Sequence, residues 1–135
     1  AAKTSQSMEF IEKFDDKFDH EIAQLGKNVS GGQKQRLSIA RAIYRKPDIF
    51  LFDDSFSALD FKTDSELRHK LKENNPDATA IIVAQRVGSI MDSDQIIVLE
   101  NGQIAGIGQH KDLLKNCEVY KEIAYSQLTE EELNA

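Results

Sequence analysis

The stretch Asp48-Ile49-Phe50-Leu51-Phe52-Asp53-Asp54 is a continuous apolar run that ends at two acids. Such a run is typical of a strand that is buried on both faces of a parallel sheet. A second run of this kind, residues 79–84, follows a segment in which Leu67 and Leu71 are spaced as on one face of a helix. The order strand, helix, strand predicts an α/β fold with buried parallel strands.

Two helices are expected before the first strand. Ser30-Gly31-Gly32-Gln33 has the pattern of a capping box, and it predicts a helix that runs to about residue 46, where Pro47 stops it. Apolar residues at helical spacing predict an earlier helix over about 5–18.

The rest of the chain is predicted to hold a helix, a β-hairpin and a last helix. Thr63 and Glu66 form another capping-box pattern and predict the start of the helix between the two strands. Asn101-Gly102 is a strong hairpin signal, joining strands over 95–99 and 103–107. A last helix is expected over about 111–128, and the acidic tail that follows is expected to be frayed.

Composition limits the class of protein. The chain has 135 residues, and 17 Lys+Arg against 23 Asp+Glu give a net charge of −6, as expected for one soluble globular domain. No apolar run is long enough to cross a bilayer. The lone Cys117 excludes a disulfide framework and a multi-cysteine zinc site, and its place on an apolar stripe indicates a core residue.

The segment Ser30-Gly31-Gly32-Gln33 is a candidate phosphate site. Two glycines at a helix start leave backbone N–H groups unobstructed, and the helix dipole favours an anion there. The Ser30 hydroxyl would add a further donor. The alternative is a plain capped helix with no ligand.

Polar residues also follow both predicted strands. Asp53 and Asp54 end the first strand, where open α/β sheets bind ligands and where acids can hold Mg²⁺ through water or orient an attacking water. Gln85 follows the second strand, and Ser57-Ala58-Leu59-Asp60 follows the acids. The alternatives are an acidic strand exit that caps the next helix and, for Gln85, an ordinary polar exit.

The order and spacing of these segments resemble the nucleotide-binding domain of ABC transporters. Residues 29–33 match the signature motif LSGGQ with Val29 in place of Leu, 49–53 match Walker B, and 57–60 match the D-loop. Gln85 falls at the switch position, and similarity continues through 94–110. The resemblance covers nearly the whole chain and is greatest to bacterial exporters with fused transmembrane and ATPase domains.

This resemblance implies a head-to-tail dimer of two nucleotide-binding domains that enclose ATP and Mg²⁺. The signature residues Ser30, Gly31, Gly32 and Gln33 would contact the γ-phosphate of ATP held by the partner domain. Asp53 would support Mg²⁺ through water, and Asp60 would lie across the dimer interface. The implied partners are a second nucleotide-binding domain and a transmembrane domain, at the cytoplasmic face of the plasma membrane.

Two positions depart from the family pattern. The catalytic base after the Walker B aspartate is usually Glu, but here it is Asp54; the switch residue is usually His, but here it is Gln85. Asp is one methylene shorter, and a shift of about 1 Å at a reacting centre can cost about 100-fold in rate. Gln can hydrogen-bond a phosphate oxygen but cannot carry a proton. The two changes together predict the degenerate, slow site of a heterodimeric exporter.

A Walker A motif, G-x-x-x-x-G-K-[ST], does not occur in the sequence. We therefore expect the C-terminal part of a nucleotide-binding domain: 1–46 from the helical subdomain, 47–128 from the ATPase core, and 129–135 an acidic tail. Without the phosphate loop the isolated chain is expected to bind ATP weakly and not to hydrolyse it. The truncated sheet is expected to expose edges and apolar faces through which copies could associate.

A soluble ABC-type ATPase of nucleic-acid or translation machinery is the alternative function. The helix from Lys34 to Lys46 carries basic residues and no acid, but it lacks the interleaved aromatic residues of a nucleic-acid surface. The acidic balance of the chain and the exporter-like hairpin favour the transporter, without nucleic acid as a partner. The transported substrate cannot be read from this sequence.

Overall fold

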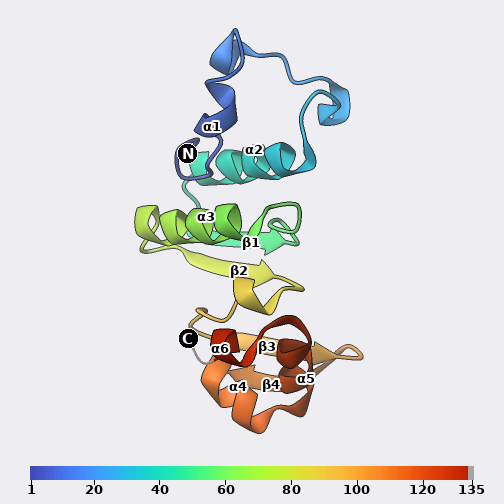
Figure 1. Cartoon of the computed structure of the whole chain (residues 1–135). Coiled ribbons are helices and arrows are strands. Elements are labelled where there is room, and N and C mark those ends of the chain that lie inside the picture. Colours follow the sequence, from blue (N-terminus) through green and yellow to red (C-terminus); the bar gives the residue numbers. More distant parts are fainter. Residues whose placement is uncertain (134–135) are drawn as a thin grey trace. The chain divides into compact units, whose positions relative to one another are not determined.

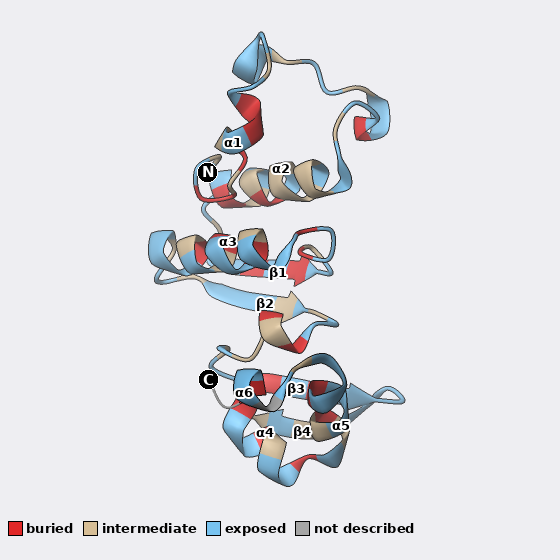
Figure 2. Ribbon diagram, viewed as in Figure 1, coloured by how far each residue is buried: buried red, intermediate tan, exposed pale blue. Residues whose placement is uncertain are grey.

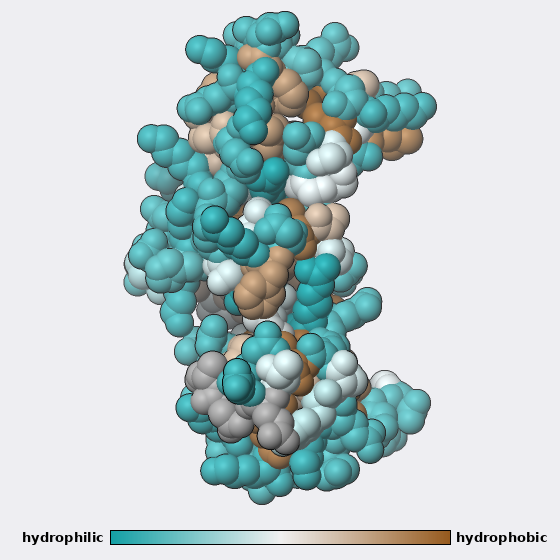
Figure 3. All heavy atoms as spheres, in the orientation of Figure 1, coloured by the Kyte–Doolittle hydropathy of each residue, from teal (hydrophilic) through white to brown (hydrophobic). Residues whose placement is uncertain are grey.

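The computed structural model describes residues 1–133, with only the backbone described for Glu130. The chain forms two compact units, residues 1–83 and residues 84 onward. Helices, a parallel strand pair and a hairpin confirm the α/β class. On the face that Figure 3 shows, most of the surface is hydrophilic.

The first unit contains the predicted strand–helix–strand arrangement (Figure 1). Strands β1 and β2 pair in parallel with Phe50 opposite Ala80 and Phe52 opposite Ile82, and α3 connects them. The elements are α1 (Met8–Ile11), α2 (Gly31–Tyr44), β1 (Ile49–Asp53), α3 (Phe61–Asn74) and β2 (Thr79–Val83), with 3-10 turns at Lys17–Asp19 and Gln24–Gly26.

One hydrophobic cluster joins α2, β1 and α3. It is built from alternate residues of β1, from residues spaced four apart on each helix, and from two residues of the loop after β1, as expected when one face of each element is buried. Its buried members are Ile39, Ile43, Phe50, Phe52, Phe56, Leu59, Leu67 and Leu71. This core fixes the start of α2 and the end of β1 in one unit.

The prediction that both strands are buried on two faces is wrong for this chain, whereas the apolar face that the truncated sheet was expected to expose is present. On β1, Phe50 and Phe52 are buried, but Ile49 and Leu51 are 62% and 69% exposed. All of β2 except Ile82 is exposed (Figure 2). The helices of this unit pack against one face of a sheet of only two strands, so the other face stays open.

The first predicted helix is much shorter than expected. Residues 8–11 are helical, and the backbone of Lys17 then takes a left-handed conformation (φ 50°). Phe14 stacks on the His20 ring with centroids 3.9 Å apart, and Phe18 is exposed. The apolar spacing was therefore not that of one continuous helix.

The second unit is a hairpin covered by helices. Its elements are a 3-10 turn at Val87–Ser89, β3 (Ile96–Glu100), β4 (Gln103–Gly108), α4 (His110–Asn116), α5 (Glu118–Gln127) and α6 (Glu130–Leu133). The antiparallel pairing of β3 with β4 confirms the hairpin, and Asn101 and Gly102 both have positive φ. Residues of β3, α4 and α5 form a second buried cluster that includes Val98, Leu113 and Tyr120.

Two predictions for the C-terminal region are wrong. The last helix is divided into α4 and α5 at Cys117, whose extended backbone (φ −122°, ψ 104°) ends one helix and begins the next. The tail is helical at 130–133 because Leu133 is buried in the second cluster and its carbonyl oxygen lies 3.1 Å from Nε2 of His110. Cys117 is buried as expected. Residues 134 and 135 lie outside the described part.

Candidate functional site

The start of α2 has the predicted capping geometry. The Ser30 hydroxyl accepts a hydrogen bond from the backbone N–H of Gln33 (3.2 Å), and the Gln33 side chain accepts one from the N–H of Ser30 (2.9 Å). The first N–H groups of a helix have no partner within the helix, so those of Gly31 and Gly32 are left for a ligand. Ser30 and Gly31 are exposed, and Ser30 retains its hydroxyl proton to donate.

The loop after β1 turns sharply at Asp54. Asp54 has a left-handed backbone (φ 49°), and its N–H donates to the carbonyl oxygen of Val83 on the neighbouring strand (3.1 Å). The hydroxyl of Ser57 donates to the carbonyl oxygen of Asp54 (3.0 Å). These bonds fold the loop back on itself, and the side chains of Asp53 and Asp54 are exposed at the end of the strand.

Asp60 caps α3, a position that the sequence prediction had given to Thr63. One carboxylate oxygen of Asp60 accepts from the N–H of Thr63 (3.0 Å), and the other accepts from the Thr63 hydroxyl (2.7 Å). The backbone hydrogen bond from Thr63 is the main cause that lowers the pKa of Asp60. The helix therefore begins at Phe61, two residues earlier than expected.

Gln35 joins the start of α2 to the loop after β1. Its amide nitrogen donates to the carbonyl oxygen of Asp54 (3.3 Å) and to the hydroxyl of Ser57 (3.1 Å). Its amide oxygen accepts from the N–H of Ala58 (2.9 Å). Sequence reasoning assigned no role to Gln35. The available signal was its spacing, because it lies four and three residues after Gly31 and Gly32 and so shares their side of the helix.

Gly32 lets the helix and the loop approach each other closely. A Cβ atom at Gly32 would lie 3.0 Å from the carbonyl oxygen of Ala58 and 3.5 Å from Cδ2 of Leu59. A Cβ at Gly31 would lie 3.7 Å from that of Ala58, an ordinary contact. The first unit thus brings the signature segment and the D-loop segment together.

Gln85 lies in the second unit. Its side chain is exposed, and its backbone carbonyl oxygen accepts from the side-chain amide of Gln127 (2.9 Å). The oxygen of that amide accepts from the N–H of Val87 (2.9 Å). Gln127 on α5, which the sequence analysis also missed, therefore fixes the backbone on both sides of Arg86.

In the part of the chain whose side chains the structure describes, no group of three or more His, Cys, Asp or Glu residues is placed to hold a metal ion. Asp53 is a single exposed carboxylate at the end of β1. A magnesium ion held through one carboxylate and several waters is compatible with that arrangement.

Comparison with known proteins finds similarity to ABC transporters. A family model described as ABC transporter matches residues 2–57, which include the start of α2 and the end of β1. The structure of a bacterial Atm1-family ABC exporter with ATP bound superposes with a TM-score of 0.89 and 37% identity over 96% of this chain. The chain matches part of an ABC exporter nucleotide-binding domain.

Curated relatives carry the same family name. An ABC transporter ATP-binding protein of Mycoplasma genitalium is 46% identical over 127 residues, which are 94% of this chain and 20% of the relative. The ATP-dependent lipid A-core flippase of Haemophilus influenzae is 39% identical over 96% of this chain and 22% of the relative. The chain covers 23% of the Atm1-family exporter. It thus spans about a fifth of the length of these ABC proteins.

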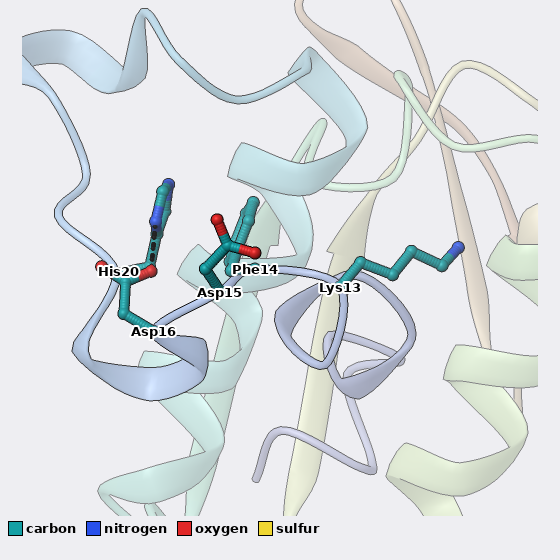
Figure 4. Close-up of a pocket in the computed structure, with 5 residues that line it drawn as sticks. All are labelled: Lys13, Phe14, Asp15, Asp16 and His20. Carbon is teal, nitrogen blue, oxygen red and sulfur yellow. Dashed lines mark hydrogen bonds and ion pairs between the residues drawn. The ribbon is translucent and has the colours of Figure 1, made fainter.

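Two further features of this chain lie outside the predicted site. Among residues 1–133, no helix is long and apolar enough to cross a membrane. A hollow in the first unit is lined by Lys13, Phe14, Asp15, Asp16 and His20, with His20 Nδ1 2.7 Å from a carboxylate oxygen of Asp16 (Figure 4). None of these five residues was predicted to bind nucleotide.

Proposed function

We propose that this chain is part of the ATP-binding domain of an ABC exporter, which binds and hydrolyses ATP to drive transport across a membrane. The observation that carries the proposal is the start of α2, where a capping box leaves Gly31 and Gly32 open to a phosphate. The likeness to an ATP-bound exporter structure supports it. The relatives named above are transporters, which favours export over nucleic-acid machinery.

In the proposed dimer the signature residues act on the nucleotide held by the partner domain. Ser30, Gly31 and Gly32 would donate hydrogen bonds to its γ-phosphate, because their donors face away from α2. Gln33 would support them through the capping box, in which its side chain is already engaged. Asp60 would lie at the interface between the two domains while it caps α3.

The opposite site would use the end of β1 and the switch residue of this chain. Asp53 would hold Mg²⁺ through water, since a carboxylate is a hard oxygen ligand that suits this ion. Asp54 would accept the proton of the attacking water, and Gln85 would hydrogen-bond a phosphate oxygen. ATP with Mg²⁺ supplies the phosphoryl group that is transferred to water.

We further propose that this site is slow. The carboxylate of Asp54 is one methylene shorter than that of Glu, and Gln85 cannot carry a proton. The signature residues of the same chain would complete a faster site on the partner. The two proposed partners are a second nucleotide-binding domain and a transmembrane domain, with the ATPase at the cytoplasmic face of the plasma membrane.

The first experiment uses the chain as it stands. The sequence has no Walker A loop, so calorimetric titration with ATP and Mg²⁺ should show only weak binding, and phosphate release should not exceed the buffer blank. Micromolar ATP binding or ATP turnover by this chain alone would contradict the expectation that the isolated chain is inactive.

The second experiment uses the complete transporter with its partner. Asp54→Glu together with Gln85→His should raise ATP turnover, because the longer carboxylate and a protonatable ring restore the missing groups. Asp92→Glu with Gln103→His makes the same chemical changes at exposed positions outside the proposed site and serves as the control. Equal turnover of the two double variants would refute the slow-site proposal, and a transporter without ATPase activity would refute the function itself.

A further inference from the structure

Gln35 is placed to connect two ligand-binding segments of the same unit. It lies in the second turn of α2, which begins with the signature residues, and its side chain reaches the loop that begins at Asp54. Its three hydrogen bonds end on groups from 19 to 23 residues further along the chain. A single side chain therefore bonds to the first residue of this loop and to two residues further along it.

The orientation of the Gln35 amide follows from its partners. Its nitrogen faces two oxygens, those of the Asp54 carbonyl and the Ser57 hydroxyl, and its oxygen faces the N–H of Ala58. Ser57 donates its own proton to Asp54, so it can accept from Gln35. A carboxylate in place of the amide would keep the bond to Ala58 and lose both donations.

The contact between helix and loop leaves little freedom to slide. A Cβ atom at Gly32 would lie 3.0 Å from the carbonyl oxygen of Ala58, and the next residue, Leu59, is buried in the core of the unit. Asp54 is in a left-handed conformation and is also bonded to β2. When the start of α2 moves, the hydrogen bonds of the Gln35 amide therefore move the backbone of Asp54 and Ala58 with it.

We propose that Gln35 is a positioning residue that couples the two ATP sites of the transporter. This inference rests on the proposed function. Phosphate binding at Ser30, Gly31 and Gly32 of this chain takes place in the partner's site, whereas Asp54 serves the chain's own site. The amide of Gln35 transmits the position of the signature segment to the catalytic loop, and it touches neither the nucleotide nor the attacking water.

The coupling is tested by kinetics of the complete transporter. Gln35→Met keeps a side chain of similar length without hydrogen bonds, and it should lower kcat about tenfold while KM for ATP stays within about twofold. Ser57→Ala should have a smaller effect of the same kind, and it should add little to Gln35→Met because the two side chains act as one unit. Gln103→Met, at an exposed strand position, is the control.

Two kinetic outcomes would overturn the coupling. One is a kcat of Gln35→Met equal to that of Gln103→Met. The other is a fall of kcat that equals the loss of folded protein measured by circular dichroism, which is the result expected of a merely structural residue because unfolding lowers the apparent kcat without changing KM. If Gln35→Met does not fold, Gln35→Glu replaces it, since its size is unchanged and only the two donations are lost.

The anchoring of the loop is tested separately on this chain by amide hydrogen exchange. Gln35→Met should raise the exchange rate at Ala58 at least about tenfold, because that N–H loses its acceptor, and Gln103→Met should not. Unchanged exchange at Ala58 would overturn the inference whatever the ATPase result. Raised exchange in a chain whose complete transporter hydrolyses no ATP would instead reject the proposed function and, with it, the coupling.

Discussion

Replacing Gly106 by Ala should destabilise the second unit through a clash with the helices that cover it. A Cβ at Gly106 on β4 would lie 2.8 Å from Sγ of Cys117 and 3.0 Å from Cδ2 of Leu113. Real Cβ atoms essentially never approach another heavy atom to 2.8 Å, so the strand or the helices must shift. Both neighbours are buried, and they leave little room for the shift.

The expected cost follows from the size of this overlap. Forcing one extra methyl group into a well-packed core typically costs about 1–3 kcal/mol, and two short contacts with buried side chains place Gly106→Ala near the upper end, at about 2–3 kcal/mol. The free energy of unfolding can be measured by urea titration followed by near-ultraviolet circular dichroism, to which Tyr120, buried in the same cluster, contributes.

Two further variants separate the clash from other effects. Gly108→Ala on the same strand is the matched control, because its Cβ would meet its nearest neighbours at an ordinary 3.6 Å. It should be neutral or stabilising by about 0.4–1 kcal/mol, since Ala restricts the unfolded chain more than Gly does. Cys117→Ala removes the Sγ atom that clashes with the new methyl group. The double variant Gly106→Ala with Cys117→Ala should therefore have a free energy of unfolding at least about 1 kcal/mol higher than that of Gly106→Ala alone. The reasoning is refuted if Gly106→Ala is as stable as Gly108→Ala, or if Cys117→Ala gives no recovery.

Three further variants probe individual contacts. Tyr120→Phe should lower the free energy of unfolding by about 1–3 kcal/mol, because the Tyr120 hydroxyl lies 2.7 Å from Nδ1 of the buried His110. The measurement is urea unfolding followed by far-ultraviolet circular dichroism, and a change near zero would contradict the role of this contact. The Arg36 hydrogen bond and charge lower the pKa of Glu9 below its ordinary value of 4.5. Glu9→Gln should therefore lower the free energy of unfolding by up to about 1 kcal/mol above pH 4.5, and this loss should disappear as the pH falls below that value. A loss that is the same at every pH would contradict a role of the Glu9 charge. Ser30→Ala should lower the free energy of unfolding by about 1 kcal/mol, because the cap of α2 is lost. Ser30→Asp should keep the cap and the stability, but its charge should repel phosphate and abolish ATP turnover at the proposed site of the partner domain. Normal turnover of Ser30→Asp would argue against a phosphate at this position.

Features encoded by a few adjacent residues could be predicted from the sequence. The capping box of Ser30 and Gln33 and the Asn101-Gly102 turn depend on local backbone geometry, and both are present. The start of α3 was misplaced because Asp60 and Thr63 are both good caps, and the bond from Asp60 to the Thr63 backbone places the start at the earlier residue.

Features that depend on distant contacts could not be predicted. The apolar pattern of β1 alone does not show that Ile49 and Leu51 lack a covering layer, and an exposed apolar face was expected only because no Walker A motif occurs in the sequence. The tail is ordered at 130–133 because Leu133 fits a core formed by residues far from it in sequence. The same applies to the candidate site: its motif residues were proposed from their order in the sequence, but Gln35 and Gln127 bond to backbone groups that only the fold brings near.

The presence of two separate hydrophobic clusters has a consequence for cooperativity. The cluster of α2, β1 and α3 and the cluster of β3, α4 and α5 each consist of residues from one unit alone. A chain with two cores need not unfold in an all-or-none manner, and a single midpoint temperature would then average two events. Tyr44 lies in the first unit, whereas Tyr120 and Tyr125 lie in the second. A tyrosine signal therefore reports both halves of the molecule, and a melting curve reports one half alone only after the tyrosines of the other unit are replaced by Phe.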